Sequence, residues 1–280
     1  MRDRKIKHIR FSVTSKCNFK CIFCDSEGFI PKTSELTLKE ITKLCKILAE
    51  VLKVTRIKFT GGEPLCREEI VEIIRNVSEL RLYKDISMTT NGFFLYEKAE
   101  ELHNAGLNRI NVSLASLKQE TFKFIYGSDS LDKVLRGLHK AKEVGLNPIK
   151  LNFVLQLIEL HKASDVLGGN GNFFDKYHVD IKPIIDRIEL KAVETKIRGS
   201  MQNRKVFVLP NSATIETITP GHDFCLGCTK LRVGCDGTLF GCLNRSDLGT
   251  NIKAELNNHY PLAKYEEIVR QVVDSREPYF

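Results

Sequence analysis

The sequence predicts an α/β fold built on a parallel sheet, and three observations support this prediction. Short runs rich in β-branched and aromatic residues alternate four times with helical runs within residues 8–145. Gly residues end several of these runs, as expected where strands and helices stop. Strand–helix alternation of this kind is typical of βα units, whose strands pair in parallel.

Each strand run is followed by a helical run. The first helix has a Thr start at Thr37, and two later helices end at Gly106 and Gly145. The expected strands are residues 8–14, 54–62, 85–92 and 109–116, and the expected helices are residues 37–52, 67–80, 97–106 and 130–145.

The alternation breaks after Gly145. Residues 149–152 and 153–161 are expected to be two strands with no helix between them, although a βα alternation requires one. Residues from 204 onward are expected to form β-hairpins, followed by a second group of cysteines. We therefore expect two parts, residues 1–190 with the βα units and residues 191–280 with the second cysteine group.

Composition limits the classes of protein. The chain of 280 residues has a formal net charge of +8 and nine cysteines. No apolar run approaches the length of about 18 residues that a membrane helix needs, and the charged first residues do not resemble a signal peptide. We therefore expect a cytoplasmic protein without a membrane partner, in which clustered thiols indicate metal or redox chemistry. The net positive charge is explained either by solubility or by an anionic substrate, and because the cations are scattered we do not expect nucleic acid.

The informative residues follow the four expected strands. Three cysteines follow the first strand, a Gly-Gly-Glu-Pro segment the second and a Thr-Asn-Gly turn the third, while Ser113 ends the fourth. Parallel sheets bind ligands at the carboxyl ends of their strands. These signals therefore predict one site at one edge of the sheet.

Cys17, Cys21 and Cys24 have the spacing C-x3-C-x2-C. Three thiolates are one short of a closed tetrahedral zinc site. In a cube-shaped [4Fe–4S] cluster they would hold three irons and leave the fourth open to a small molecule. A structural zinc site with a distant fourth ligand is the alternative.

The C-x3-C-x2-C run and the Gly-Gly-Glu-Pro segment resemble the signature of radical S-adenosylmethionine (SAM) enzymes. The resemblance implies a partial (β/α) barrel and a cluster whose open iron binds SAM. It also implies that an electron from the cluster cleaves SAM and leaves a 5′-deoxyadenosyl radical. The residues it implies for SAM binding are Phe23, Gly61, Gly62, Glu63 and Ser113.

A second group, Cys225, Cys228 and Cys242, has the spacing C-x2-C-x13-C. Together the two triads resemble the MoaA-like GTP 3′,8-cyclases of molybdenum cofactor synthesis, in motif order and over nearly the whole chain. The resemblance implies a second [4Fe–4S] cluster, carried by the C-terminal region, whose open iron binds guanine. The contacts it implies for GTP are Arg10, Lys58, Thr89, Lys230, Leu231 and Arg232.

The implied reaction begins when the radical takes the hydrogen from ribose C3′. The ribose radical then attacks guanine C8 to give 3′,8-cyclo-7,8-dihydroguanosine 5′-triphosphate. The implied partners are a ferredoxin or flavodoxin as electron donor and a cyclic pyranopterin monophosphate synthase downstream. Whether the chain forms a homodimer stays open.

The region 149–161 departs from the resemblance. Relatives carry about one more βα unit there, with a phosphate-binding lysine, so we expect a barrel one unit short. Lys150 and Lys162 are candidates to replace that lysine. Two alternatives therefore stay open: a non-catalytic paralogue, and a radical SAM enzyme whose auxiliary cluster serves another substrate such as a peptide.

Overall fold

The structure is a computed structural model. It describes residues 6–24, 31, 33–152, 182–199, 204–211, 214–217, 228–242, 245–258 and 260–275. The chain forms two compact units, one of residues 1–153 with 229–276 and the other of residues 154–228 with 277–280. The division expected near residue 190 stays a prediction.

The first unit contains the βα units that the sequence predicts. Helix α4 is an addition, because the sequence analysis expected a single helix between the fourth and fifth strands. In chain order the elements are β1 (His8–Ser12), α1 (Leu38–Leu52), β2 (Arg56–Thr60), the short 3₁₀ helix η2 (Pro64–Cys66), α2 (Ile70–Glu79), β3 (Asp85–Thr90), α3 (Leu95–Asn104), β4 (Arg109–Ser113), α4 (Gln119–Tyr126), α5 (Leu131–Glu143) and β5 (Ile149–Asn152).

A capping box at Thr37 and Glu40 fixes the residue at which α1 begins. Thr37 precedes the helix and accepts a hydrogen bond from the backbone N–H of Glu40, while the Glu40 carboxylate accepts the backbone N–H of Thr37 at 2.7 Å. This reciprocal pair satisfies two N–H groups that a helix start leaves without partners. The Thr start predicted from sequence is confirmed.

In the part of the chain that the structure describes, the main sheet has eight strands in the order β11-β10-β9-β1-β2-β3-β4-β5. Strands β9 (Lys230–Val233) and β1 to β5 run parallel to one another, whereas β10 (Thr238–Phe240) pairs antiparallel with both β9 and β11 (Thr250–Asn251). The sequence analysis did not expect β9 beside β1. This pairing brings the segment after Cys228 next to the start of the chain.

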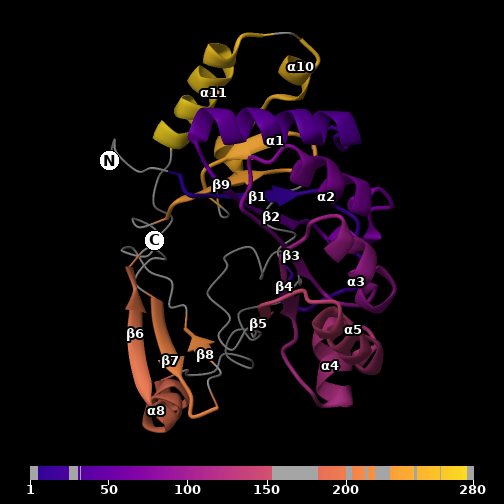
Figure 1. Ribbon diagram of the computed structural model, residues 1–280, viewed down its shortest axis with the longest axis vertical. Helices are drawn as coiled ribbons and strands as arrows, with labels where there is room; N and C mark the ends of the chain where they lie inside the picture. The colour runs from indigo at the N-terminus through magenta and orange to yellow at the C-terminus, as the bar shows by residue number, and fades with distance from the viewer. Residues whose placement is uncertain are drawn as a thin grey trace, which may run out of the picture. The chain divides into compact units, whose positions relative to one another are not determined.

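Helices cover one face of this sheet. Figure 1 shows α1, α2, α3 and α5 following one another along strands β1 to β5. Alternate side chains of β1, β2, β3, β4 and β9 point into that layer and are buried, since a strand presents every second residue to the same face. The buried strand residues on this face include Ile9, Phe11, Ile57, Phe59, Ile86, Met88, Ile110, Val112, Leu231 and Val233.

The end of the first unit adds three helices, the 3₁₀ helix η4 (Ser246–Leu248), α10 (Lys253–Leu256) and α11 (Leu262–Asp274). Helix α11 packs on α1. The α1 residue Lys43 donates from Nζ to the carbonyl of Leu256 at 2.6 Å. These contacts join the last described residues to the first helix.

The second unit contains the predicted hairpins. Its three-stranded antiparallel sheet has the order β6 (Glu194–Arg198), β7 (Arg204–Val208) and β8 (Thr214–Glu216), preceded by α8 (Lys182–Lys191). Glu216 binds Arg198 at 2.8 Å and Arg204 at 2.9 Å. The strand predicted over residues 153–161 lies outside the described residues, whereas the one predicted over 149–152 is β5. None of the described helices is long and apolar enough to cross a membrane.

Candidate functional site

The structure brings the four sequence signals to one edge of the sheet. Strands β1, β2, β3 and β4 lie side by side and parallel, so their carboxyl ends meet at the same edge. The cysteine loop follows β1, Gly61 and Gly62 follow β2, the Thr-Asn-Gly turn closes β3, and Ser113 is the last residue of β4. This is the arrangement that parallel strands predict.

The Gly-Gly pair packs against the cysteine loop. Gly62 N–H donates to the Thr14 carbonyl and Glu63 N–H to the Lys16 carbonyl, both at 2.8 Å. A Cβ at Gly61 would lie 2.5 Å from the Thr14 oxygen, and one at Gly62 would lie 2.3 Å from the Lys16 oxygen. The two glycines are therefore required for this backbone approach, whatever ligand also lies there.

Arg67 holds the start of the cysteine loop through hydrogen bonds to backbone carbonyls. Its Nη1 donates to the Val13 carbonyl at 2.7 Å and its Nη2 to the Leu36 carbonyl at 2.8 Å, although the side chain is buried. Glu35 lies 3.8 Å from Nη1 and also accepts hydrogen bonds from Thr14 and the Ser15 backbone. A planar guanidinium can satisfy several carbonyls that a lysine could not.

Glu63 has its carboxylate fully buried. One oxygen accepts Thr90 Oγ1 at 2.7 Å and Leu65 N–H at 3.0 Å, and the other accepts Asn91 N–H at 2.6 Å. Burial raises the pKa of this carboxyl to about 7, against the lowering effect of the three donors. Glu63 therefore ties the turn after β2 to the turn after β3.

The tie extends to the cysteine loop. Asn91 Nδ2 donates to Asn18 Oδ1 at 2.8 Å, and Asn18 follows Cys17 directly. Cys66 also reaches Asn18, with 3.6 Å between its Sγ and Oδ1. The loop that carries the thiols is thus held by both neighbouring turns.

The three predicted cluster thiols lie in one loop. Cys17 and Cys24 are exposed and Cys21 is half-buried. Burial and the neighbouring thiols at Cys24 and Cys17 raise the pKa of Cys21 to about 12, so bound cations would be needed to keep the Cys21 thiol deprotonated. The backbone N–H of Phe19 donates to Cys17 Sγ at 3.4 Å, a contact that favours a thiolate.

This donor set fits an iron–sulfur cluster. Among the described residues, no three His, Cys, Asp or Glu side chains lie close enough to hold one metal ion. Cysteines that bind different irons of a cube need not meet at one point. Phe23, predicted to contact SAM, is half-buried with its ring edge-on to Tyr126 at 5.7 Å.

The sheet face opposite the helices is cationic. Register sets Arg10 of β1 between Lys58 of β2 and Arg232 of β9. Two residues nearer the amino ends of the strands, His8 of β1 lies across from Lys230 of β9. The two predicted cations of β9 therefore share a face with the two predicted from β1 and β2.

Leu231 lies on the other face. Its side chain is fully buried in the core, while its neighbours Lys230 and Arg232 are half-buried on the cationic face. Only the backbone of Leu231 can therefore reach a ligand bound on that face.

A second row of polar residues lies on the same face, nearer the carboxyl ends of the strands. Thr89 of β3 lies across from Asn111 of β4, and Asn111 lies across from Lys150 of β5. Lys150, one of the two candidates for the replacement lysine, is therefore on the same face as the predicted GTP contacts. Lys162, the other, lies outside the described residues.

Neighbouring cations create a positive potential at Lys58. Burial, followed by the charges of Arg109, Arg10 and Lys150, lowers the pKa of its amine to about 7. Burial and the charges of Arg56 and Lys230 likewise lower the pKa of His8 to about 4. Both effects favour an anionic ligand, whose binding would restore the charged form of the lysine.

Sequence reasoning missed two members of this face, Asp85 and Arg109. Arg109 donates from Nε and Nη2 to the two Asp85 carboxylate oxygens at 2.9 and 2.7 Å. The pair fixes the guanidinium near Lys58. Their alternation with buried Ile86 and Ile110 along the strands was the signal that could have found them.

The second cysteine group is only partly described. Cys225 lies outside the described residues. Cys228 and Cys242 are half-buried, and they belong to different compact units. Cys235, which lies between Cys228 and Cys242 in the sequence, is buried and packs against Phe240.

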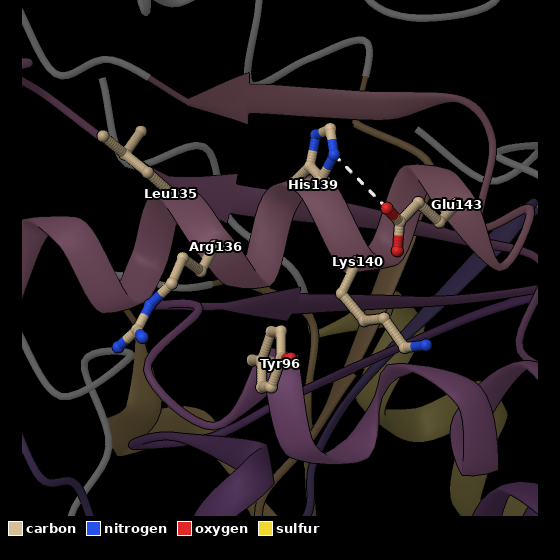
Figure 2. Close-up of a pocket in the computed structure, with 6 residues that line it drawn as sticks. All are labelled: Tyr96, Leu135, Arg136, His139, Lys140 and Glu143. Atoms are coloured by element: carbon tan, nitrogen blue, oxygen red, sulfur yellow. Dashed lines mark ion pairs between the residues drawn. The ribbon is translucent and has the colours of Figure 1, made fainter.

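A shallow cavity of about 470 Å³ lies elsewhere, on the outer surface of α3 and α5 (Figure 2). His139 and Glu143 form an ion pair there at 3.3 Å between Nε2 and Oε1. None of the residues predicted for the site lines it. The lining residues are Tyr96, Leu135, Arg136, His139, Lys140 and Glu143.

Comparisons with protein families divide the chain in two. Residues 11–161 match the radical SAM superfamily, and residues 153–280 match the family described as Molybdenum Cofactor Synthesis C.

Curated relatives match over nearly the whole chain. The chain is 38% identical to a probable GTP 3′,8-cyclase of Thermococcus kodakarensis, covering 99% of this chain and 97% of the relative. It is 36% identical to proteins of the same name from Saccharolobus islandicus, with the same coverage, and from Methanococcus aeolicus, covering 100% and 98%. The first alignment extends over 307 positions, more than the 280 residues here, so the relative has residues that this chain lacks.

Solved structures share the fold. The structure of native anSMEcpe with bound AdoMet matches with a TM-score of 0.60 and 18% identity, over 89% of this chain and 79% of the other. Streptococcus suis SuiB bound to S-adenosylmethionine matches with a TM-score of 0.60 and 16% identity, over 94% and 66%. At this level of identity the likeness concerns the fold alone.

Proposed function

The chain belongs to the GTP 3′,8-cyclase family of the radical SAM superfamily, and from this premise we propose how its own residues serve the reaction. The protein is an enzyme that converts GTP to (8S)-3′,8-cyclo-7,8-dihydroguanosine 5′-triphosphate, the first step of molybdenum cofactor biosynthesis. An iron–sulfur cluster and S-adenosylmethionine belong to this chemistry. When bound, they supply the one-electron chemistry that removes hydrogen from an unactivated C–H bond.

The assignment depends on one observation: a group of thiols and a group of cationic side chains lie close to each other at the same sheet. The thiols of Cys17, Cys21 and Cys24 follow β1 at its carboxyl end. The cations lie on the sheet face opposite the helices. The first would hold a cluster, and the second suits a triphosphate, which needs several positive partners.

We assign the edge of the sheet to SAM. Phe23, Gly61, Gly62 and Ser113 lie at the carboxyl ends of β1, β2 and β4, in agreement with the roles implied by the family resemblance. For Glu63 we propose a positioning role, because its two carboxylate oxygens already accept three hydrogen bonds from Leu65, Thr90 and Asn91.

We assign the cationic face to the triphosphate. Arg10, Lys58, Lys230 and Arg232 are the contacts predicted from sequence, and the Lys58 environment supports an anion there. Lys150 joins them as the phosphate contact that the sequence left open, since its charge acts on Lys58. Thr89 borders this group on β3.

We further propose that Cys225, Cys228 and Cys242 hold a second [4Fe–4S] cluster with one open iron, carried by residues 191–280, that binds the guanine. The fit of three thiols to a cube with a free corner is the same as for the first triad. Cys235 is not among the proposed ligands, because its thiol is 1% exposed in an apolar contact.

The parallel sheet is proposed to be a partial (β/α) barrel about one βα unit short. The excess of alignment positions over residues supports a loss relative to the first curated relative. Lys150, on the strand before the break, keeps a cation on the ligand face, so the shortened sheet keeps a means of binding phosphate.

For partners we propose an acidic low-potential electron donor, ferredoxin or flavodoxin, and a downstream cyclic pyranopterin monophosphate synthase. A reducing compartment, the cytoplasm, suits the exposed thiols Cys17 and Cys24.

Anaerobic reconstitution with GTP, S-adenosylmethionine and dithionite tests the assignment. The cyclised nucleotide is the expected product, together with 5′-deoxyadenosine. Deoxyadenosine without cyclised nucleotide would favour a radical enzyme acting on another substrate. Clusters without any cleavage of S-adenosylmethionine would favour a non-catalytic paralogue.

A further inference from the structure

Asn111 lies at the middle of β4 with its side chain 9% exposed. Its Oδ1 atom accepts no hydrogen bond from any donor in the part of the chain that the structure describes. Buried side-chain oxygens without a donor are uncommon in folded proteins, because the oxygen loses its water without replacement. Such an atom on a ligand-binding face points to a donor supplied by the ligand.

The strand pattern puts Asn111 on the ligand face. Its neighbours Ile110 and Val112 are fully buried in the core under the helices, so the Asn111 side chain is directed to the opposite, cationic face. Register sets it between Thr89 of β3 and Lys150 of β5.

Asn111 also lies between two proposed subsites. Ser113, two residues toward the carboxyl end on the same face, is assigned to S-adenosylmethionine, and Arg109, two residues toward the amino end, lies among the cations. Residues two apart on a strand are separated by about 7 Å. The reacting C3′ atom belongs to the sugar of GTP, which must face the S-adenosylmethionine subsite while its 5′ side carries the phosphates.

The chemistry of the free oxygen excludes the phosphates. A carbonyl oxygen accepts hydrogen bonds, whereas the phosphate oxygens of GTP are acceptors too, so the two would repel each other. Ribose offers hydroxyl donors, and guanine offers N–H donors. The position beside Thr89 and between the two subsites favours the ribose.

We propose that Asn111 accepts a hydrogen bond from a ribose hydroxyl of GTP and so fixes the sugar for attack at C3′, an inference that rests on the proposed function. The same contact would make the enzyme select ribonucleotides over deoxyribonucleotides, because a deoxy analogue leaves the amide oxygen buried without a donor.

The test measures binding of three nucleotides to cluster-loaded protein by anaerobic calorimetry, without S-adenosylmethionine. GTP, 2′-deoxyGTP and 3′-deoxyGTP are compared for wild type, Asn111→Ala and Asn111→Ser. Asn111→Ala is expected to weaken GTP roughly threefold to tenfold, the usual range for one neutral hydrogen bond. It should leave unchanged the affinity for the analogue that lacks the partner hydroxyl. Asn111→Ser keeps an acceptor and should retain part of the discrimination.

Asn108→Ala is the matched control. Asn108 precedes the same strand, and its Oδ1 accepts the Ile86 backbone N–H of β3 at 2.7 Å. Its removal loosens the same pair of strands without touching the ligand face, so the ratio of GTP to deoxynucleotide affinity should stay that of wild type. Thermal unfolding of each variant identifies any that does not fold.

Three results would overturn the inference. In the first, Asn111→Ala weakens GTP and both deoxy analogues equally. In the second, it weakens none of them. In the third, both deoxy analogues respond to Asn111→Ala as GTP does, and inosine triphosphate, added as a fourth nucleotide that lacks the guanine amino group, does not, which would place the contact at the base. Failure of the wild type to bind GTP or to form cyclised nucleotide would instead contradict the proposed function itself.

Discussion

The lowered pKa of Lys58 predicts that the protein takes up a proton when it binds GTP. Burial and three neighbouring cations lower the pKa of its amine to about 7 in the free protein. At about pH 8 only about a tenth of these amines would therefore be charged. A bound triphosphate would supply negative charge beside the amine and raise its pKa, so the bound form carries the proton.

The magnitude follows from that pKa. Because the neutral amine must be protonated before it pairs with phosphate, apparent affinity falls as pH rises through the pKa of the free form. Between about pH 6 and about pH 8 the loss due to Lys58 should be about tenfold, which is about 1.4 kcal/mol. Proton uptake at about pH 8 should approach 0.9 per GTP, and at about pH 7 about half a proton.

Calorimetry in buffers with different ionisation enthalpies measures this uptake directly. Lys58→Arg is the matched control, since a guanidinium stays charged throughout this range. The γ-phosphate of GTP also titrates near neutral pH, but it does so in both proteins and cancels in the difference. Equal proton uptake by wild type and Lys58→Arg at about pH 8 would refute the reasoning.

The remaining predictions concern the cluster loop and its supports. Cys24→Ala should remove about four irons and leave about four on the second triad, measured by iron analysis; an unchanged iron count would count against the assignment. Arg67→Ala should lower the free energy of unfolding by about 2–4 kcal/mol in urea, because two carbonyls and Glu35 lose their partner, and Arg67→Lys should recover only a fraction. A loss below about 0.5 kcal/mol would show that water replaces the guanidinium. Glu63→Gln should destabilise by about 1–3 kcal/mol, since its amide N–H₂ would face a donor at Thr90 or Asn91, and unchanged stability would mean that the carboxyl is already protonated.

The βα units were predictable because local signals agree with the fold. Thr37 starts α1 with a capping box, and the Gly-Gly pair after β2 fits only where backbones meet closely. The placement of Cys17, Cys21 and Cys24 after β1 follows from the same alternation. These features depend on a few neighbouring residues, which a sequence displays directly.

The pairing of β9 with β1 could not be predicted in this way. It joins Arg10 to Arg232 across more than 200 residues, and no local pattern specifies which edge a short strand joins. The role of Glu63 was likewise out of reach, because a carboxylate that suits an ammonium group also suits backbone N–H donors. Only the register of adjacent strands revealed Asn111 beside Lys150.

We propose that the chain holds two cubes, each ligated by three cysteines and open at one iron. Iron and acid-labile sulfide analysis of anaerobically purified protein tests it most directly. We expect about eight irons and eight sulfides per chain. About four of each, or zinc in place of iron, would contradict it.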